Sequence, residues 1–587
     1  MKRGKIYRMW KVLIKSIREF KKPSILAPTF VSLEVVIECI IPFVTAQLVN
    51  QIKAGCGADV ILSYGLALLV MAGFSLMLGW LSGTTCAAAS SGFARNLRKD
   101  MFYNIQSFSF ENIDRFLPSS LVTRLTTDVT NVQMAYMMII RVAIRSPLML
   151  IFAVIMSFIM GGKLALIFAF AIPVLGIGLY LIIRKAHPIF KRVFRQYDVF
   201  NRSIQENIQG IRVVKSFVRE DYEKRKFEAA AEDVRVEFTN AEKILAFSNP
   251  IMQFCLYINM VFILTFGAYM IISTEGLHFN VGQLSALMVY SFQTLMSLMM
   301  LSMVFVMITI ADESGHRIVE VLSEKSALKN PKHPVYEVKD GSVDFSGVSF
   351  RYSEKAERMV LECIDLHIRS GETIGILGGT GSSKTSLVQL IPRLYDVTEG
   401  IVKVGGLDVR AYDIEALRGQ VSMVLQSNLL FSGTINENLR WGNPLAADEE
   451  LREACRLAQA DEFISHFPDG YDTRIEQGGT NVSGGQKQRL CIARALLKKP
   501  KILILDDSTS AVDTHTDAKI RKAFRDYIPD TTKIIIAQRV ASVQDADRIV
   551  LMDKGGIAAV GTHRELLQNS EIYREVYESQ NKAGERS

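Results

Sequence analysis

The feature that most constrains this chain is a series of apolar runs within its first 310 residues. A helix needs roughly 20 apolar residues to cross the hydrocarbon core of a bilayer, and each run is close to that length. Inside a bilayer the backbone must satisfy its own hydrogen bonds, so such runs fold as helices. The sequence therefore predicts six membrane-spanning helices, over residues 25–49, 60–84, 136–160, 163–183, 247–272 and 283–309.

The connections between these runs alternate in length and charge. Those after the first, third and fifth runs are short, whereas those after the second and fourth are long and heavily charged. We expect the long stretches, residues 90–132 and 185–245, to continue as helices beyond the membrane and to contact a soluble domain. Six crossings return the chain to its starting side.

Basic residues crowd the segment that precedes the first apolar run. Positive charge beside a first span favours a cytoplasmic N-terminus, and this segment lacks the apolar core and cleavage site of a removable signal. We interpret residues 1–22 as an interfacial helix. Because the basic charge gathers here, nucleic-acid binding is the weaker explanation of the formal net charge of +8. The basic residues are Lys2, Arg3, Lys5, Arg8, Lys11, Lys15, Arg18, Lys21 and Lys22.

From about Val343 the chain changes character. Short β-rich runs alternate with helical segments, which is typical of a soluble α/β domain. We expect a helical membrane domain over residues 23–311, a polar linker over 312–340 and an α/β domain over 341–587.

A glycine-bearing loop follows the buried strand predicted at residues 373–377. Strand, loop and helix start form the arrangement in which backbone N–H groups hold phosphates. Lys384 would reach the β and γ phosphates and Thr385 would meet Mg²⁺, although the P-loop pattern has glycine where this chain has Ser383. A flexible surface turn is the alternative. The candidate phosphate-binding residues are Gly378, Gly379, Thr380, Gly381, Ser382, Ser383, Lys384, Thr385 and Ser386.

A second apolar strand, predicted at Lys501–Leu505, ends in two carboxylates. An apolar strand that delivers a carboxylate beside a P-loop is the Walker B arrangement, in which Asp506 holds Mg²⁺ through water. Beside a P-loop, an ordinary strand end capped by acids is the weaker explanation. ATP and Mg²⁺ are therefore the expected cofactors.

The run Asn481–Arg489, a glycine turn leading into a helix, closely resembles the signature motif of ATP-binding cassette (ABC) proteins. On this motif the whole chain resembles an exporter half-transporter, with the membrane domain first and a P-loop nucleotide-binding domain second. The resemblance implies that Tyr352 stacks on adenine, that Gln426 is the Q-loop residue at the metal, and that Asp513 belongs to the D-loop. It also implies that Gly210–Phe217 lies in the second long internal loop. The signature residues are Ser483, Gly484, Gly485 and Gln486.

Two residues depart from the family pattern at the same chemical step. Asp507 stands where the family has the glutamate that activates water, and its carboxylate is set back by about 1 Å or more. Gln538 stands where the family has a histidine, and glutamine can donate a hydrogen bond but cannot shuttle a proton. We predict a site that binds nucleotide but hydrolyses it poorly. Neutral drift at a still-active site is the alternative.

In this family two cassettes close face to face, and each ATP lies between the P-loop of one and the signature of the other. An intact signature beside an impaired P-loop site implies a heterodimer with a second ABC half-transporter, with one degenerate and one competent site. The expected function is ATP-driven, multidrug-type export of a small hydrophobic or amphipathic molecule. The expected location is a bacterial cytoplasmic membrane, with the ATP-binding domain in the cytoplasm.

The sequence leaves several other functions open. An ATP-gated channel, a homodimeric lipid or peptide exporter of the same fold, and a regulatory ATPase with a membrane anchor remain alternatives. Six spans with long internal loops argue against the anchor. An importer is disfavoured, because importers of this family generally keep their membrane and ATP-binding parts on separate chains.

Charges inside the predicted spans are a further feature. Glu34 and Glu38 lie four residues apart in the first span, as do Arg141 and Arg145 in the third. Such groups are costly at membrane depth and face a cavity or one another. We favour a structural ion-pair cluster over a site for cationic cargo.

The sixth span carries methionines at helical spacing. Flexible methionine side chains suit either a cavity for varied apolar cargo or plain packing. We lean towards the cargo role. These residues are Met296, Met299, Met300, Met303 and Met307.

Overall fold

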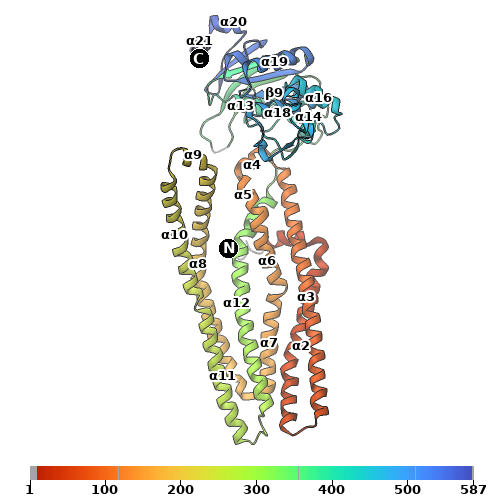
Figure 1. Ribbon diagram of the computed structural model, residues 1–587, viewed down its shortest axis with the longest axis vertical. Helices are drawn as coiled ribbons and strands as arrows, with labels where there is room; N and C mark the ends of the chain where they lie inside the picture. Colours follow the sequence, from red (N-terminus) through yellow and green to blue (C-terminus); the bar gives the residue numbers. More distant parts are fainter. Residues whose placement is uncertain (1–8, 117, 354–355, 509, 585–587) are drawn as a thin grey trace. The chain divides into compact units, whose positions relative to one another are not determined.

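The computed structural model describes residues 9–116, 118–353, 356–508 and 510–584 (Figure 1). The chain forms two compact units. The first extends to Gln106 and resumes over Leu117–Glu324, and the second comprises Ser107–Phe116 together with the chain from Lys325 onwards. Lys2, Arg3, Lys5 and Arg8 of the predicted interfacial helix lie outside the described residues.

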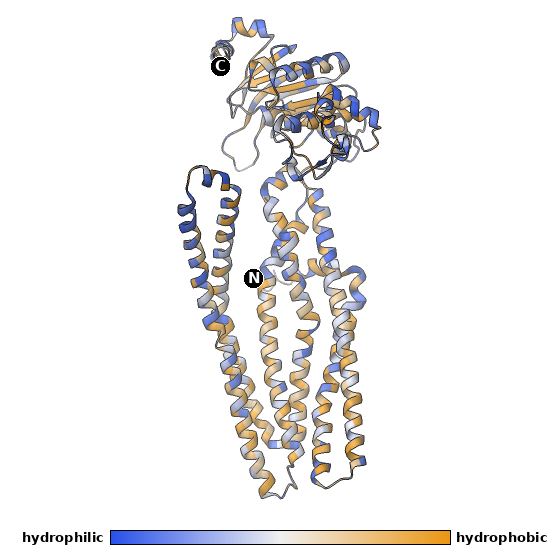
Figure 2. Ribbon diagram, in the orientation of Figure 1, coloured by the Kyte–Doolittle hydropathy of each residue, from blue (hydrophilic) through white to orange (hydrophobic). Residues whose placement is uncertain are grey.

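The first unit is a set of long helices that lie side by side (Figure 1). Figure 2 shows that most of these long helices are hydrophobic, whereas the α9–α10 region is hydrophilic. The helices are η1 (Ile14–Phe20), α2 (Lys21–Lys53), α3 (Ala58–Gln106), α5 (Pro118–Thr123), η2 (Arg124–Asp128), α6 (Val129–Ile140), α7 (Val142–Gly161), η3 (Gly162–Leu166), α8 (Ile167–Gln209), α9 (Ile211–Ser216), α10 (Glu220–Leu245), α11 (Ser248–Ser273) and α12 (Val281–Ser323).

Among the described residues of this unit, five helical stretches are long and apolar enough to cross a membrane. One of them, Pro118–Ala186, is 69 residues long and would rise roughly 100 Å as one straight helix, far more than one crossing needs. It contains α7 and the first part of α8, which are separated by η3, beginning at Gly162, where φ is +49°. In α3 the most apolar window has no buried residue. Exposed apolar side chains of this kind are suited to contact with lipid, so the protein is an integral membrane protein.

The borders of the first unit differ from the sequence prediction in two places. Helix α12 continues to Ser323, so the first part of the predicted linker is helical, because its polar residues extend the helix beyond the apolar run. The described part of the predicted interfacial helix packs on other helices: Leu13 is fully buried, and Ser16 and Arg18 both bond Asp100 of α3.

The described residues of the second unit form two larger sheets and a two-stranded sheet of β7 and β8. A mixed six-stranded sheet has the order β12-β11-β3-β10-β9-β6, parallel except for β12, and an antiparallel sheet has the order β2-β1-β4-β5. The strands are β1 (Val343–Phe350), β2 (Leu361–Ile368), β3 (Thr373–Gly378), β4 (Glu399–Val404), β5 (Leu407–Asp408), β6 (Val421–Val424), β7 (Gly433–Thr434), β8 (Arg474–Ile475), β9 (Ile502–Asp506), β10 (Thr532–Ala537), β11 (Arg548–Asp553) and β12 (Gly556–Gly561).

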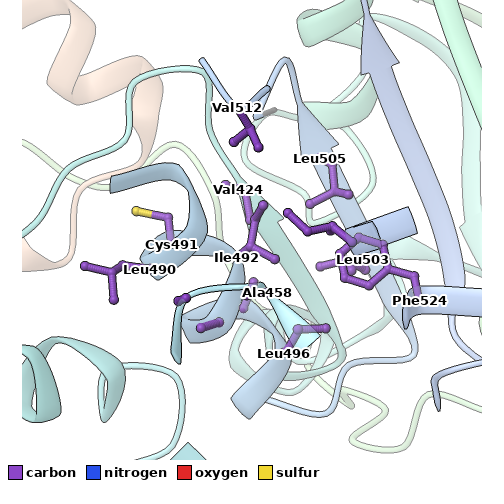
Figure 3. Packing of buried hydrophobic residues seen from close by; sticks show 14 of the residues in the cluster. Val424, Ala458, Leu490, Cys491, Ile492, Leu496, Leu503, Leu505, Val512 and Phe524 are labelled. Carbon is purple, nitrogen blue, oxygen red and sulfur yellow. The ribbon is translucent and has the colours of Figure 1, made fainter. Parts of the chain in front are cut away.

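Helices cover this core. The strands β9 and β10 are buried along their whole lengths, as expected for parallel strands with both faces covered. Figure 3 shows Ile492 and Leu496 packed beside Leu503 and Leu505 of β9. The helices of the unit are α4 (Phe110–Phe116), α13 (Lys384–Gln389), α14 (Ile414–Gln420), α15 (Ile435–Leu439), α16 (Asp448–Leu457), α17 (Asp461–Ile464), α18 (Gly484–Leu497), α19 (Thr514–Tyr527), α20 (His563–Asn569) and α21 (Glu571–Gly584).

Candidate nucleotide-binding site

Four neighbouring parallel strands, β3, β10, β9 and β6, end at one edge of the larger sheet. Ligands of open α/β sheets bind outside the carboxyl ends of the strands. The segment after each strand supplies a predicted site residue: the P-loop after β3, Gln538 after β10, Asp507 after β9 and Gln426 after β6. These segments line one cavity of about 290 Å³, formed by Thr380, Gly381, Ser383, Lys384, Thr385, Ser386, Gln426, Asp506, Asp507, Ile536 and Gln538.

The loop between β3 and α13 turns through two left-handed residues. Gly381 has φ +83° and Ser383 has φ +72°. A residue with a Cβ pays about 1–2 kcal/mol for this conformation, which explains why the P-loop pattern has glycine at the position of Ser383. The loop nevertheless keeps its turn in this chain.

Lys384 is folded over this loop. Its Nζ donates to the carbonyl oxygens of Gly378 and Gly379, each at 2.8 Å, and to Ser382 Oγ at 3.2 Å. Burial lowers the pKa of Lys384, and the charges of Asp506 and Asp507 oppose that shift. The ammonium group is thus held at the cavity wall, where an anionic phosphate would stabilise its charge.

Thr385 and Asp506 form the predicted metal pair. Thr385 Oγ1 donates to Asp506 Oδ2 at 2.9 Å, and Asp506 is 2% exposed. Burial raises the pKa of Asp506, with a further rise from Asp507. A buried carboxylate beside a hydroxyl, with its charge poorly compensated, fits Mg²⁺, which prefers oxygen ligands and keeps several waters. Bound Mg²⁺ would supply charge neutralisation of the phosphates.

Tyr352 lies on the same unit, just past β1. Its ring packs edge-on to Phe350 at 4.9 Å and to Tyr395 at 5.1 Å, and its hydroxyl lies 2.8 Å from Ser386 Oγ of α13. Burial raises the pKa of Tyr352, although its side chain is still 41% exposed. One ring face thus remains available for a stacked base.

Asp507 and Gln538 contact each other directly. Gln538 Nε2 donates to Asp507 Oδ2 at 3.2 Å, and Asp507 itself has a left-handed backbone with φ +47°. Sequence reasoning placed both residues at the hydrolytic step but did not predict this bond, since 31 positions separate them. The bond directs the carboxylate towards an amide that cannot accept a proton from water. Gln538 can donate a hydrogen bond to a γ-phosphate, but its amide, unlike a histidine, cannot relay a proton.

The signature residues begin α18. Ser483 and Gln486 form a reciprocal capping box, with Ser483 N–H donating to Gln486 Oε1 at 2.9 Å and Gln486 N–H donating to Ser483 Oγ at 3.3 Å. A Cβ at Gly485 would lie 2.8 Å from the carbonyl oxygen of Ala511, so glycine is required by this close approach. None of these residues lines the P-loop cavity described above.

Two glutamines that the sequence analysis did not single out support these segments. Gln488 donates to Ser510 Oγ at 3.2 Å and accepts from Ala511 N–H at 3.0 Å, which joins the signature helix to the D-loop. Gln580 donates to the Gln538 carbonyl at 2.8 Å. Asp513 of the D-loop caps α19 through Thr516 N–H, and this bond lowers the pKa of Asp513. Gln488 and Gln580 can be recognised as supporting residues only from their contacts in space, because no sequence motif marks them.

Comparison with known proteins identifies the family. Residues 25–298 match the ABC transporter transmembrane region and residues 361–510 match the ABC transporter family. The chain is 36% identical to the uncharacterized ABC transporter ATP-binding protein YfiB of Bacillus subtilis, over 93% of this chain and 94% of the relative. This chain belongs to the ABC transporter family. The ABC resemblance drawn from the signature motif is thereby confirmed.

Other ABC transporters agree with this assignment. The uncharacterized protein Rv1273c of Mycobacterium tuberculosis is 36% identical over 92% of this chain and 93% of its own length. A bacterial Atm1-family ABC exporter, solved with ATP bound, has the same fold, with a TM-score of 0.82, 24% identity and coverage of 96% of this chain and 98% of that chain. A helical membrane domain followed by an ABC ATP-binding domain is therefore the architecture of this chain.

Proposed function

We propose that this ABC transporter is one half of a heterodimeric exporter whose own ATP site is degenerate. The observation that carries the proposal is the 3.2 Å hydrogen bond from Gln538 to Asp507, which pairs a carboxylate shorter than the family's glutamate with an amide that cannot relay a proton. Thr385, Lys384 and Asp506 keep the chemistry of nucleotide and Mg²⁺ binding. The site would therefore bind ATP and hydrolyse it slowly.

The signature gives this subunit its catalytic contribution. Ser483 and Gln486 cap α18 in the regular way, and glycine is retained at the close approach of Gly485. Because these residues do not line the chain's own P-loop cavity, they are proposed to serve an ATP held by a second half-transporter. The partner would supply the glutamate and histidine that this chain lacks.

Exposed apolar residues around α9 support a second chain as well. Val213 is 60% exposed, Phe217 73% and Val218 81%, in a region that is otherwise hydrophilic (Figure 2). A soluble segment rarely exposes such a patch without a partner. We take the cover to be the ATP-binding domain of the second half-transporter.

Motion would reach the membrane half through the segment after α3. Helix α4 belongs to the ATP-binding unit, where Asp114 accepts a 2.7 Å hydrogen bond from Tyr395, whose ring contacts Tyr352. Six crossings, with α7 and α8 as separate spans, give the exporter topology. ATP binding would favour one of two global states and switch the membrane half between inward-open and outward-open forms.

The test is the ATPase activity of the purified chain, alone and with its co-purified partner. We expect the chain alone to bind ATP with little turnover, and the pair to hydrolyse ATP. Robust activity of a homodimer of this chain, abolished by Lys384→Ala, would refute the degenerate site and favour a homodimeric exporter. ATP-dependent single-channel currents of the pair in a planar bilayer would favour a channel instead.

A further inference from the structure

The intramembrane charges form a cluster with an unbalanced carboxylate. Arg145 Nη1 donates to Glu34 Oε1 at 2.7 Å, while Arg145 Nη2 donates to Glu38 Oε1 at 2.8 Å and Oε2 at 2.7 Å. We name Glu34, Glu38 and Arg145 the acid–arginine cluster. One guanidinium serves two carboxylates, so the cluster with both acids ionised carries a net charge of −1.

The second arginine lies near the acids without pairing directly with them among the described residues, since Gly79, which lies against Glu34, is one turn from Gly83 on α3. Arg141 lies beside Gly83 of α3, and none of the ion pairs among the described residues includes it. Three of the four charges thus form the structural pairing favoured by the sequence analysis, and Arg141 does not. A carboxylate oxygen without a direct partner at membrane depth is costly, and a proton or a cation can stabilise it.

Buried polar atoms at the cluster also lack partners. Glu34 is 7% exposed, and its Oε2 atom has no hydrogen-bond partner among the described residues. Gln293 of α12 donates weakly to the Glu38 carbonyl at 3.5 Å, and its own Oε1 is buried without a partner. The side chains of Glu38 and Arg145 are 24% and 32% exposed, so a ligand has access to the cluster from that side.

A face of methionines begins at the same place. At about 100° per residue, Gln293, Met296, Met300, Met303 and Met307 fall within an arc of roughly 80° on α12, and Met299 lies outside it. We name these four methionines the methionine face. Met300 is 43% exposed and Met303 52%, so this stripe does not serve as core packing within the described chain.

We propose that the acid–arginine cluster and the methionine face form one binding site for an organic cation with a bulky apolar body. The positive charge would pair with Glu38, the more exposed of the two acids, beside the unpartnered Oε2 of Glu34, while the apolar body would lie against the flexible methionines. This inference rests on the proposed export function, because it names the class of molecule that would be carried. It requires no bond to be made or broken.

The test is equilibrium binding of two matched probes to the full chain, co-purified with its partner in lipid nanodiscs without ATP. Tetraphenylphosphonium and tetraphenylborate have similar size and opposite charge. We expect the wild-type protein to bind the cation at least about tenfold more tightly than the anion. Equal affinity for the two ions, or a preference for the anion, would overturn the proposal without any substitution.

Substitutions then separate charge from apolar contact. Glu38→Gln should weaken binding of the cation about tenfold and leave the anion unchanged or tighter, whereas Glu275→Gln, in the exposed turn before α12, should change neither. The double change Met300→Ala with Met303→Ala should weaken both ions similarly. Undiminished cation binding by folded Glu38→Gln protein would contradict the proposal. If that variant does not fold, Glu38→Asp should retain the cation preference, and its loss would count against the site.

Equilibrium binding of the ions and ATP-driven transport are measured in separate experiments. Charge-selective binding in a complex without ATP-driven transport would defeat the proposed function and leave the site intact. Transport of other molecules by a complex that fails to prefer the cation would defeat only the site.

Discussion

At the scale of single residues, Ser383 shows how a departure from a motif can be tolerated. Its left-handed backbone costs about 1–2 kcal/mol, yet Lys384 and Thr385 beside it keep their contacts. The cost falls on stability and not on the phosphate-binding atoms. Glycine would remove this conformational cost, but part of the gain in stability would be offset because glycine raises the entropy of the unfolded chain.

We predict that Ser383→Gly raises the free energy of unfolding of the ATP-binding unit by about 0.5–1 kcal/mol and preserves ATP binding. The matched control is Gly381→Ala, which introduces a Cβ at φ +83° and should lower stability by about 1 kcal/mol. Thermal unfolding of each variant measures its stability, and the rise in its melting temperature on addition of ATP measures nucleotide binding. A destabilised Ser383→Gly protein would show that the serine hydroxyl makes an essential contact.

Arg145 carries a second prediction at this scale. Arg145→Met leaves two carboxylates without a cation, so we expect a loss of about 2–3 kcal/mol, at the low end for a broken buried pair because the guanidinium is 32% exposed. Glu38→Gln should cost less, since Arg145 keeps Glu34. The melting temperatures of the two variants in detergent compare their losses of stability. Equal losses would contradict the account in which one guanidinium pairs with both carboxylates.

At the scale of elements, contiguous motifs could be predicted and long-range contacts could not. The strand, loop and helix around Lys384 and the strand ending at Asp506 are local patterns, and β3, α13 and β9 follow them closely. The contact of Asp507 with Gln538, and that of Gln488 with the D-loop, join distant segments and leave no local signal. The first part of the predicted linker is helical, because α12 continues to Ser323 and polar residues also suit an exposed helix.

Helix α4 gives a prediction for an element. Tyr395→Phe removes the hydrogen bond to Asp114 but keeps the ring contact with Phe110, at 6.1 Å between centroids. We expect faster amide hydrogen exchange in residues 110–116 and a stability loss below about 1.5 kcal/mol. Tyr412→Phe, which loses a buried bond to the Val404 carbonyl, should destabilise the unit without a selective effect on α4. Unchanged amide exchange in α4 after Tyr395→Phe would show that this hydrogen bond does not help to transmit motion from the ATP-binding unit to the membrane half.

At the scale of the whole molecule, each half of the chain is incomplete alone. Apolar residues around α9 are exposed, and the signature residues do not line the P-loop cavity of their own chain, as the proposed second half-transporter would explain. Sequence motifs identified the ABC family and its order of domains, and the comparisons confirm both. Hydropathy predicts six crossings, whereas the described residues contain five long apolar helical stretches, one of which joins α7 to the first part of α8.

The most direct test of the degenerate site compares two variants of this chain within the co-purified pair, by steady-state ATPase activity. Asp507→Asn removes the only carboxylate at the hydrolytic position of this chain's site and should leave the rate within about twofold of wild type. Ser483→Arg blocks the signature and should lower it at least about tenfold, while Ser483→Thr, which keeps the helix cap, should not. Loss of activity in Asp507→Asn with little effect of Ser483→Arg would contradict the account.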